Sequence, residues 1–218
     1  MFRFASMADH PSTRVDHPST RPDQPEYFDD MFAKSDDPWK FQSRWYERRK
    51  RALTLACLPS DRYANGFEPG CANGELSARL ATRCERLLVS DGIDKAVTLS
   101  RERLKGQTNV EVRKAWVPKD WPRDKFDLIV LSEFLFYLKP EVVEEIAFKA
   151  KESLMPGGTI LACHWRHPIA HCVVTGDDAH DALDRLLGLP NQCHVVEPSM
   201  RLDVWSAGPT AAEKDGLS

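Results

Sequence analysis

The sequence predicts an α/β protein built on a Rossmann-like, doubly wound and mostly parallel sheet of seven strands, and three features carry that prediction. Short apolar segments typical of strands alternate with helical patterns from Tyr63 to Trp165. The stretch FEPGCANGELSARLA, Phe67–Ala81, is typical of a strand end, a glycine-bracketed turn and the start of a helix. Near the C-terminus, two further strand-like segments are joined so tightly that they must pair antiparallel.

The parallel part of the sheet is expected to contain five strands. The first is short and ends at Phe67-Glu68, with Asn65-Gly66 as a turn that leads into it. The run FDLIVLS, residues 126–132, is almost continuously apolar, as in a strand buried on both faces. The other elements expected here are strands at Arg86–Asp91, Val110–Ala115 and Thr159–Trp165, a helix that carries Leu76 and Leu80, and helices at Asp94–Leu104 and Glu141–Leu154, with Pro156-Gly157-Gly158 as the turn into the fifth strand.

The alternation of strands and helices changes after Trp165. DDAHDALDRLLGL has the pattern of a helix, and CHVVE and MRLDVWSA then face each other across Pro198-Ser199. We therefore expect the sheet to end in an antiparallel hairpin and not in another strand–helix–strand unit.

The N-terminus contains a direct repeat. DHPSTR occurs at Asp9–Arg14 and again at Asp16–Arg21, and this polar, proline-containing composition cannot bury a core. The sequence therefore predicts a disordered tail over residues 1–26, a single domain over residues 27–207 and a flexible tail over residues 208–218.

A helix is expected between the repeat and the sheet. From Asp36 to Pro59, aromatic and apolar residues recur at helical spacing, and the last proline ends the pattern. Trp45 is expected in the core, whereas Trp39 and Tyr46 suit either the core or a ligand. These aromatic residues exceed what one core-facing stripe requires, so we expect the helix to form a lid over the site.

Composition excludes several classes of function. Of 218 residues, 42% are hydrophobic and 29% charged, and the net charge of −3 provides no broad basic surface for a nucleic acid. Six cysteines without a CxxC pair favour reduced thiols and a cytoplasmic location. No segment approaches the roughly 18 consecutive apolar residues of a membrane span.

The glycine turn favours a cationic ligand over a phosphate. A dinucleotide fingerprint starting at Gly70 would require a small residue at position 75, where Glu75 stands, and no Walker lysine follows Gly74. Glu68 at the strand end adds a second carboxylate. S-adenosylmethionine carries a sulfonium and an ammonium and has no phosphate, and Asp91, 23 residues after Glu68, is placed to accept its ribose hydroxyls or to cap the following helix.

These residues resemble a known family. EPGCANG, Asp91, FDLIVLSEFLFYL and the terminal hairpin are similar to the class I S-adenosylmethionine-dependent methyltransferases, with Ala72 in place of the usual middle glycine. DPWKFQSRWYERRK, EPGCANGELSARLA, SEFLFYL and RLDVW resemble more narrowly the nodulation-protein-S type of N-methyltransferase. That family methylates the free amine of a chitooligosaccharide. The resemblance implies a methyl transfer to a small-molecule amine, with an aminosugar or oligosaccharide as one candidate.

The expected site has a cofactor end and a chemical end. The residues expected at the cofactor are Tyr46, Glu68, Gly70, Cys71, Ala72, Gly74, Asp91, Gly92, Trp116, Val117 and Ser132. Glu133 is expected to bind the amine, with His164 and Tyr137 as further candidates for proton removal, because all three follow strands on the cleft side.

Three alternatives stay open from sequence. An O-methyltransferase would use the same scaffold, and a non-catalytic cofactor-binding module would keep the same turn. CHWRHPIAHC, residues 163–172, could suggest a metal cluster, but its spacing matches no common zinc pattern, and we expect a substrate-side loop without metal in which Arg166 contacts the substrate. The sequence does not indicate an oligomeric state.

Overall fold

The computed structural model describes residues 21–217. The DHPSTR repeat lies almost wholly outside the described residues, and so do residues 1–20 of the tail expected over residues 1–26. A helix begins at Pro25, inside that expected tail. Within the described range, no helix is long and apolar enough to cross a membrane.

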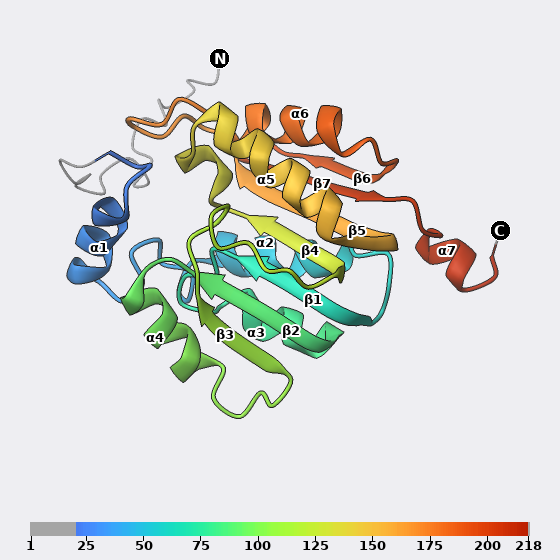
Figure 1. Cartoon of the computed structure of the whole chain (residues 1–218), viewed down its shortest axis with the longest axis horizontal. Helices are drawn as coiled ribbons and strands as arrows, with labels where there is room; N and C mark the ends of the chain where they lie inside the picture. Colours follow the sequence, from blue (N-terminus) through green and yellow to red (C-terminus); the bar gives the residue numbers. More distant parts are fainter. Residues whose placement is uncertain (1–20, 218) are drawn as a thin grey trace, which may run out of the picture.

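The sheet has seven strands in the order β3-β2-β1-β4-β5-β7-β6. Their bounds are β1 Tyr63–Pro69, β2 Cys84–Asp91, β3 Val110–Lys114, β4 Phe126–Ser132, β5 Leu154–Trp165, β6 Asn191–Val196 and β7 Met200–Ser206. The pairs among β1 to β5 are parallel, whereas β7 pairs antiparallel with both β5 and β6. The predicted fold class and terminal hairpin are thereby confirmed (Figure 1).

Helices cover both faces of the sheet (Figure 1). The helices are α1 Pro25–Lys34, α2 Trp45–Ala56, α3 Ser77–Leu80, α4 Asp94–Arg103, α5 Pro140–Ser153, α6 Gly176–Leu187 and α7 Ala211–Lys214, with 3-10 turns η2 Ala81–Arg83 and η3 Leu135–Tyr137. One core cluster joins α5 and α6 to the sheet through residues such as Ile146 and Leu183. The cluster on the other face includes Leu80 of α3 and Leu53 of α2.

The first strand differs from its prediction for a packing reason. Asn65-Gly66 lies inside β1 and is not a turn before it. Position 66 has room only for a glycine, because a Cβ there would come within 2.7 Å of Cys84 Sγ on the neighbouring strand. Asn65 pairs with Arg86 of β2, and its side chain donates to the Lys125 carbonyl just before β4.

The predicted lid helix is also wrong in its extent. Only α2 is helical in this stretch, and the chain before it forms turns in which Lys40 has a φ of +60°. Trp45 at the start of α2 is 68% exposed and is no core anchor. The element that reaches over the end of the sheet is α1, whose Tyr27 and Phe32 are buried.

Candidate functional site

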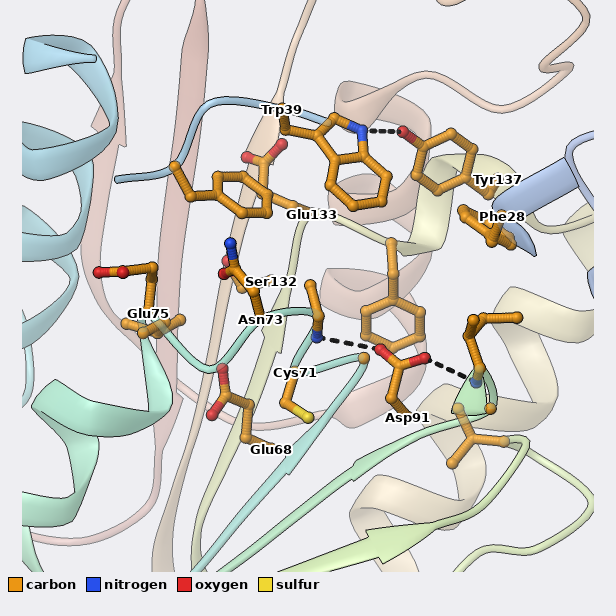
Figure 2. Close-up of a pocket in the computed structure, with 18 of the residues that line it drawn as sticks. Phe28, Trp39, Glu68, Cys71, Asn73, Glu75, Asp91, Ser132, Glu133 and Tyr137 are labelled. Atoms are coloured by element: carbon orange, nitrogen blue, oxygen red, sulfur yellow. Dashed lines mark hydrogen bonds between the residues drawn. The ribbon is translucent and has the colours of Figure 1, made fainter. Parts of the chain in front are cut away.

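A pocket opens beyond the carboxyl ends of β1, β2 and β4 (Figure 2). It holds about 1180 Å³ when its open mouth is counted. The strand order reverses between β1 and β4, and ligands of open α/β sheets bind at such a point. Residues from α1, the turns at 39–41, α2 and the segment 115–117 complete the wall.

The turn after β1 is held by its neighbour strand. Gly70 has a φ of +73°, and its amide donates to the Ser90 carbonyl at 2.7 Å. Ala72 has a φ of +48°, an unusual conformation for a residue with a side chain. Its amide donates to Asp91 Oδ2 at 3.0 Å, so the end of β2 fixes the turn.

Among the described residues, the buried side-chain atoms without a hydrogen-bond partner include two acceptors at the turn. They are Glu68 Oε2 and Asn73 Oδ1, and both residues line the pocket. An unpartnered buried acceptor is costly, and a bound ammonium would supply the missing donors. Burial and nearby Asp91 raise the pKa of Glu68 to about 8. These residues fit the amino-acid end of S-adenosylmethionine.

Asp91 is placed both to cap the following helix and to accept hydrogen bonds from a ribose, the two roles considered from sequence. Its Oδ1 accepts from the Ile93 amide at 3.0 Å, at the start of α4, while its side chain lines the pocket. Burial raises its pKa to about 6, against the hydrogen bonds from backbone amides that lower it. Each carboxylate oxygen can accept more than one hydrogen bond, so capacity remains for a ribose.

A flat aromatic wall lies beside Asp91. Trp116 packs so closely on Gly92 that a Cβ on the glycine would come within 2.0 Å of the indole ring. Ile93 and Val117 line the same part of the pocket. This slot suits a planar ring, as expected for adenine.

Glu133 lies at the other end of the pocket on a strained backbone. Its φ is +61°, and backbone strain of this kind collects at functional sites. Lys50 Nζ of α2 is 3.1 Å from Glu133 Oε1 and 2.8 Å from Glu47 Oε2. Ser132 lines the pocket just before it.

The pKa values in this group follow from burial and charge. Burial raises the pKa of Glu133, and Lys50 opposes the shift. Burial alone would lower the pKa of Lys50, but Glu133 and Glu47 outweigh it and raise that pKa. The lysine is therefore a fixed cation between two carboxyl groups.

Aromatic residues close the pocket near Glu133. Tyr137 lines it, and its hydroxyl accepts from the Trp39 indole nitrogen at 3.2 Å. Burial raises the pKa of Tyr137, so the phenol stays protonated. Phe28 and Phe32 of α1 line the same pocket, which makes α1 part of the cover. Figure 2 shows Phe28 beside Tyr137.

Three predicted site residues lie elsewhere. His164 is fully buried behind the pocket and cannot reach an acceptor. Tyr46 is outside the lining because its hydroxyl donates to the Ser199 carbonyl and its ring packs on Trp165. Gly74 shapes the turn at a φ of +77° without facing the cavity. The other predicted residues line the pocket, and Cys71 is buried with a pKa raised by burial, as expected of an inert thiol.

None of residues 163–172, the histidine-rich segment, lines the pocket. Arg166 is paired with Asp177 at 2.9 Å and donates to the Glu197 carbonyl, so the side chain expected at the substrate already has partners of its own. Among residues 21–217, no group of three or more His, Cys, Asp or Glu side chains could hold a metal ion.

Sequence reasoning missed Lys50, Glu47 and Asn73. Lys50 lies in the run RRKR, of which Arg48 and Arg49 bond to surface partners whereas Arg51 also lines the pocket. The helical spacing of Lys50 from Glu47 was the available signal. Asn73 stands inside the glycine turn, so its position could have marked it.

The sheet order, the glycine turn after β1 and the acid at the end of β2 define the fold of class I S-adenosylmethionine-dependent methyltransferases. The family model of Nodulation protein S (NodS) matches residues 28–171. The chain belongs to the NodS family.

Solved and curated relatives agree with this membership. A crystal structure of a candidate methyltransferase from Pseudomonas syringae is 45% identical, with a TM-score of 0.68 over 75% of this chain and 99% of that one. The N-methyltransferase NodS from Bradyrhizobium japonicum WM9, in complex with S-adenosyl-L-homocysteine, is 25% identical with a TM-score of 0.75 over 84% and 97%. Nodulation protein S of Rhizobium tropici is 32% identical over 58% of this chain and 54% of its own length. The chain spans about half to three fifths of the length of these curated relatives.

Proposed function

We propose that this protein is an S-adenosylmethionine-dependent methyltransferase that methylates an amine nitrogen of a small molecule. The solved NodS relative is described as an N-methyltransferase and was crystallised with S-adenosyl-L-homocysteine. The observation that carries the proposal for this chain is the set of carboxyl groups in its pocket, which a cationic ligand would hold in their ionised form. Five lining residues carry carboxyl groups (Glu47, Glu68, Glu75, Asp91 and Glu133), against the two cations Lys50 and Arg51.

The cofactor supplies a methyl group activated by positive sulfur. In this chain, Glu68 and Asn73 would hold its ammonium, Asp91 its ribose, and Gly92 with Trp116 its adenine. The carboxylates near the turn favour a cation and disfavour a phosphate, which agrees with this ligand.

An amine acceptor must reach the reaction uncharged. An amine that enters as an ammonium is attracted by Glu133, whose buried carboxyl group has a raised pKa suited to accepting a proton. Lys50 holds the carboxyl in place from α2 without competing as a base, since its own pKa is raised. The remaining work is alignment, which contributes roughly 7–11 kcal/mol in well-oriented reactions.

A panel of acceptors tests the proposal. Methyl transfer from labelled S-adenosylmethionine is measured on amines, glycosides and hydroxylated metabolites, including deacetylated and fully N-acetylated chitooligosaccharides. We expect labelled product only from compounds with a free amine. Product from hydroxyl acceptors alone would replace this proposal with an O-methyltransferase.

A further inference from the structure

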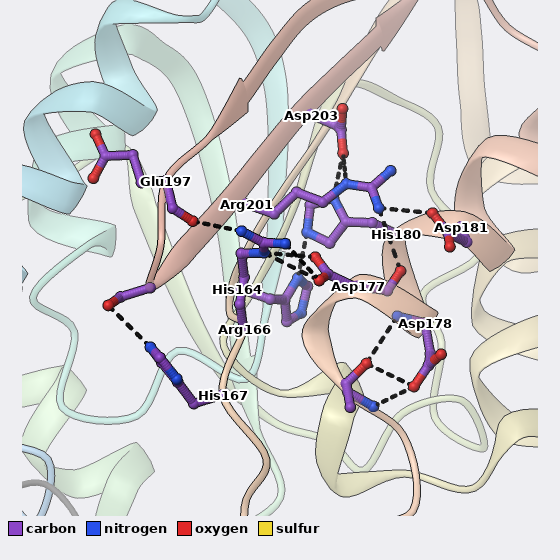
Figure 3. Close-up of polar contacts among 12 residues, drawn as sticks. His164, Arg166, His167, Asp177, Asp178, His180, Asp181, Glu197, Arg201 and Asp203 are labelled. Atoms are coloured by element: carbon purple, nitrogen blue, oxygen red, sulfur yellow. Dashed lines mark hydrogen bonds and ion pairs between the residues drawn. The ribbon is translucent and has the colours of Figure 1, made fainter.

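A series of buried hydrogen bonds joins Asp203, His180 and His164 behind the pocket (Figure 3). It ends on the backbone amide of Leu135, two residues after Glu133. Asp203 Oδ2 of β7 is 2.6 Å from His180 Nδ1 of α6. His180 Nε2 is 3.0 Å from His164 Nδ1 of β5. His164 Nε2 is 3.4 Å from the Leu135 amide nitrogen. Asp203, His180 and His164 are fully buried.

The donors and acceptors of this series of hydrogen bonds can be assigned from its two ends. Burial alone would raise the pKa of Asp203, but hydrogen bonds from His180 and His194 outweigh it and hold the pKa below its usual range. Asp203 is therefore a carboxylate and only accepts, also from Arg201 Nε at 2.8 Å. Burial lowers the pKa of both His164 and His180, so each ring carries one proton.

One arrangement of protons satisfies every contact. His180 must donate from Nδ1 to Asp203, which leaves its Nε2 as an acceptor. His164 must then donate from Nδ1 to His180, which leaves its own Nε2 as an acceptor. The Leu135 amide can only donate, and it meets that nitrogen. The assignment is consistent from β7 to the turn after β4.

The turn that receives this contact carries the strained residue of the site. Glu133 has a φ of +61°, and its amide donates to the Cys163 carbonyl at 3.0 Å. Two consecutive residues of β5, Cys163 and His164, therefore hold both ends of the segment from Glu133 to Leu135. A positive φ persists only where its surroundings determine it.

We propose that His164 is a positioning residue, held in one tautomer by His180 and Asp203, which fixes the turn that aims Glu133 into the pocket. The inference rests on the proposed function, because it assigns Glu133 a role in the methyl transfer. It replaces the direct catalytic role expected for His164. His164 acts through the Leu135 amide and does not contact substrate.

Two substitutions at one position separate the acceptor from the bulk of the ring. His164→Met fills the space but offers no comparable acceptor, whereas His164→Gln offers an amide oxygen near the place of Nε2. We expect the methionine variant to bind S-adenosyl-L-homocysteine like the wild type while its single-turnover rate falls about 10- to 100-fold, as for a small misplacement. The glutamine variant should recover most of that rate. His167→Gln, which changes an exposed histidine that contacts Ser199 Oγ outside this network, is the control and should keep the wild-type rate.

Several outcomes of this experiment would overturn the inference. A folded methionine variant with the wild-type rate would do so, as would equal losses in all three variants or no recovery with glutamine. A wild-type measurement covers the case in which the variants fail to fold. Nitrogen-15 NMR of the histidine-labelled full chain should show a protonated Nδ1 and an unprotonated Nε2 on His164. A proton on Nε2 would contradict the inference, whatever the protein methylates.

Discussion

Glu133 combines strain, burial and charge at a single residue. It follows β4, has a φ of +61° and pairs with Lys50 at 3.1 Å. A buried carboxyl group whose partner comes from a different element is sensitive to both charge and position. A substitution at Glu133 is therefore the most direct test of the proposed chemistry.

Glu133→Gln tests that chemistry. The variant keeps the shape and removes the charge, so affinity for S-adenosyl-L-homocysteine should survive while single-turnover methylation of an amine falls about 10²- to 10⁴-fold, the range of acid–base assistance. Calorimetry and rapid-quench kinetics measure the two quantities. Glu144→Gln, which removes a surface carboxylate paired with Arg185, is the matched control. An unchanged rate would remove Glu133 from the mechanism.

The cofactor end is tested at Gly70 and Asp91. Gly70→Val places a branched side chain at a φ of +73°, where a Cβ is already 3.3 Å from the Phe134 ring. Asp91→Ala removes the acceptor for the Ala72 and Ile93 amides as well as the expected ribose contact. We expect both folded variants to lose affinity for S-adenosyl-L-homocysteine by calorimetry. Wild-type affinity in both would contradict the cofactor assignment.

Residues near in sequence were easier to predict than residues brought together by topology. The turn from Glu68 to Gly74 is one local motif, and most of its members line the pocket. His164 appeared catalytic because it ends a cleft-side strand. Its partners His180 and Asp203 come from α6 and β7, so only the fold shows that its ring points away from the pocket.

At the scale of elements, strands that are buried along their whole length could be predicted from the sequence, whereas segments of irregular backbone could not. β4 has the predicted bounds because its apolar run is buried between two parallel neighbours. The segment from Asp36 to Arg44 has helical spacing, yet Asp37 accepts hydrogen bonds from the Phe41 and Gln42 amides and stabilises turns instead. Local side-chain bonds of this kind compete with helix formation.

The cover of the pocket is tested by two truncations. Removal of residues 1–20 should leave binding and turnover unchanged. Removal of residues 1–35 also takes Phe28 and Phe32 from the pocket, and the loss of this apolar contact should weaken S-adenosyl-L-homocysteine binding about tenfold or more. A deletion through Glu47 also removes Trp39 and should abolish activity. Full turnover after that longest deletion would show that these N-terminal residues are not needed to cover the pocket.

At the scale of the whole molecule, the buried carboxyl group of Glu68 makes stability depend on pH. The pKa of Glu68 is about 8 in the folded protein against an ordinary value of 4.5, so the folded state holds a proton that the unfolded chain releases. The stability from this group is present below the unfolded pKa and is lost as pH rises towards 8. The buried histidines His164 and His180 have lowered pKa values, so they stay neutral in the folded protein. They change the pH dependence of stability mainly below about pH 6.5, where histidines of the unfolded chain become protonated.

Thermal unfolding between pH 6.5 and 8 isolates this effect. The wild type should lose stability relative to Glu68→Gln across this range, because the glutamine cannot ionise. A saturating concentration of S-adenosyl-L-homocysteine should reduce the loss, since its ammonium favours the carboxylate. A difference between the two proteins that does not change with pH would contradict the raised pKa.

The central claim is that the anionic pocket transfers a methyl group from S-adenosylmethionine to an amine nitrogen. The most direct measurement is a single-turnover reaction with a carbon-13 methyl label and a matched pair of acceptors, a chitooligosaccharide with one free amine and its fully N-acetylated form. We predict that the label appears as an N-methyl signal with the free amine and not at all with the N-acetylated form. An O-methyl signal, or equal transfer to both compounds, would contradict the account.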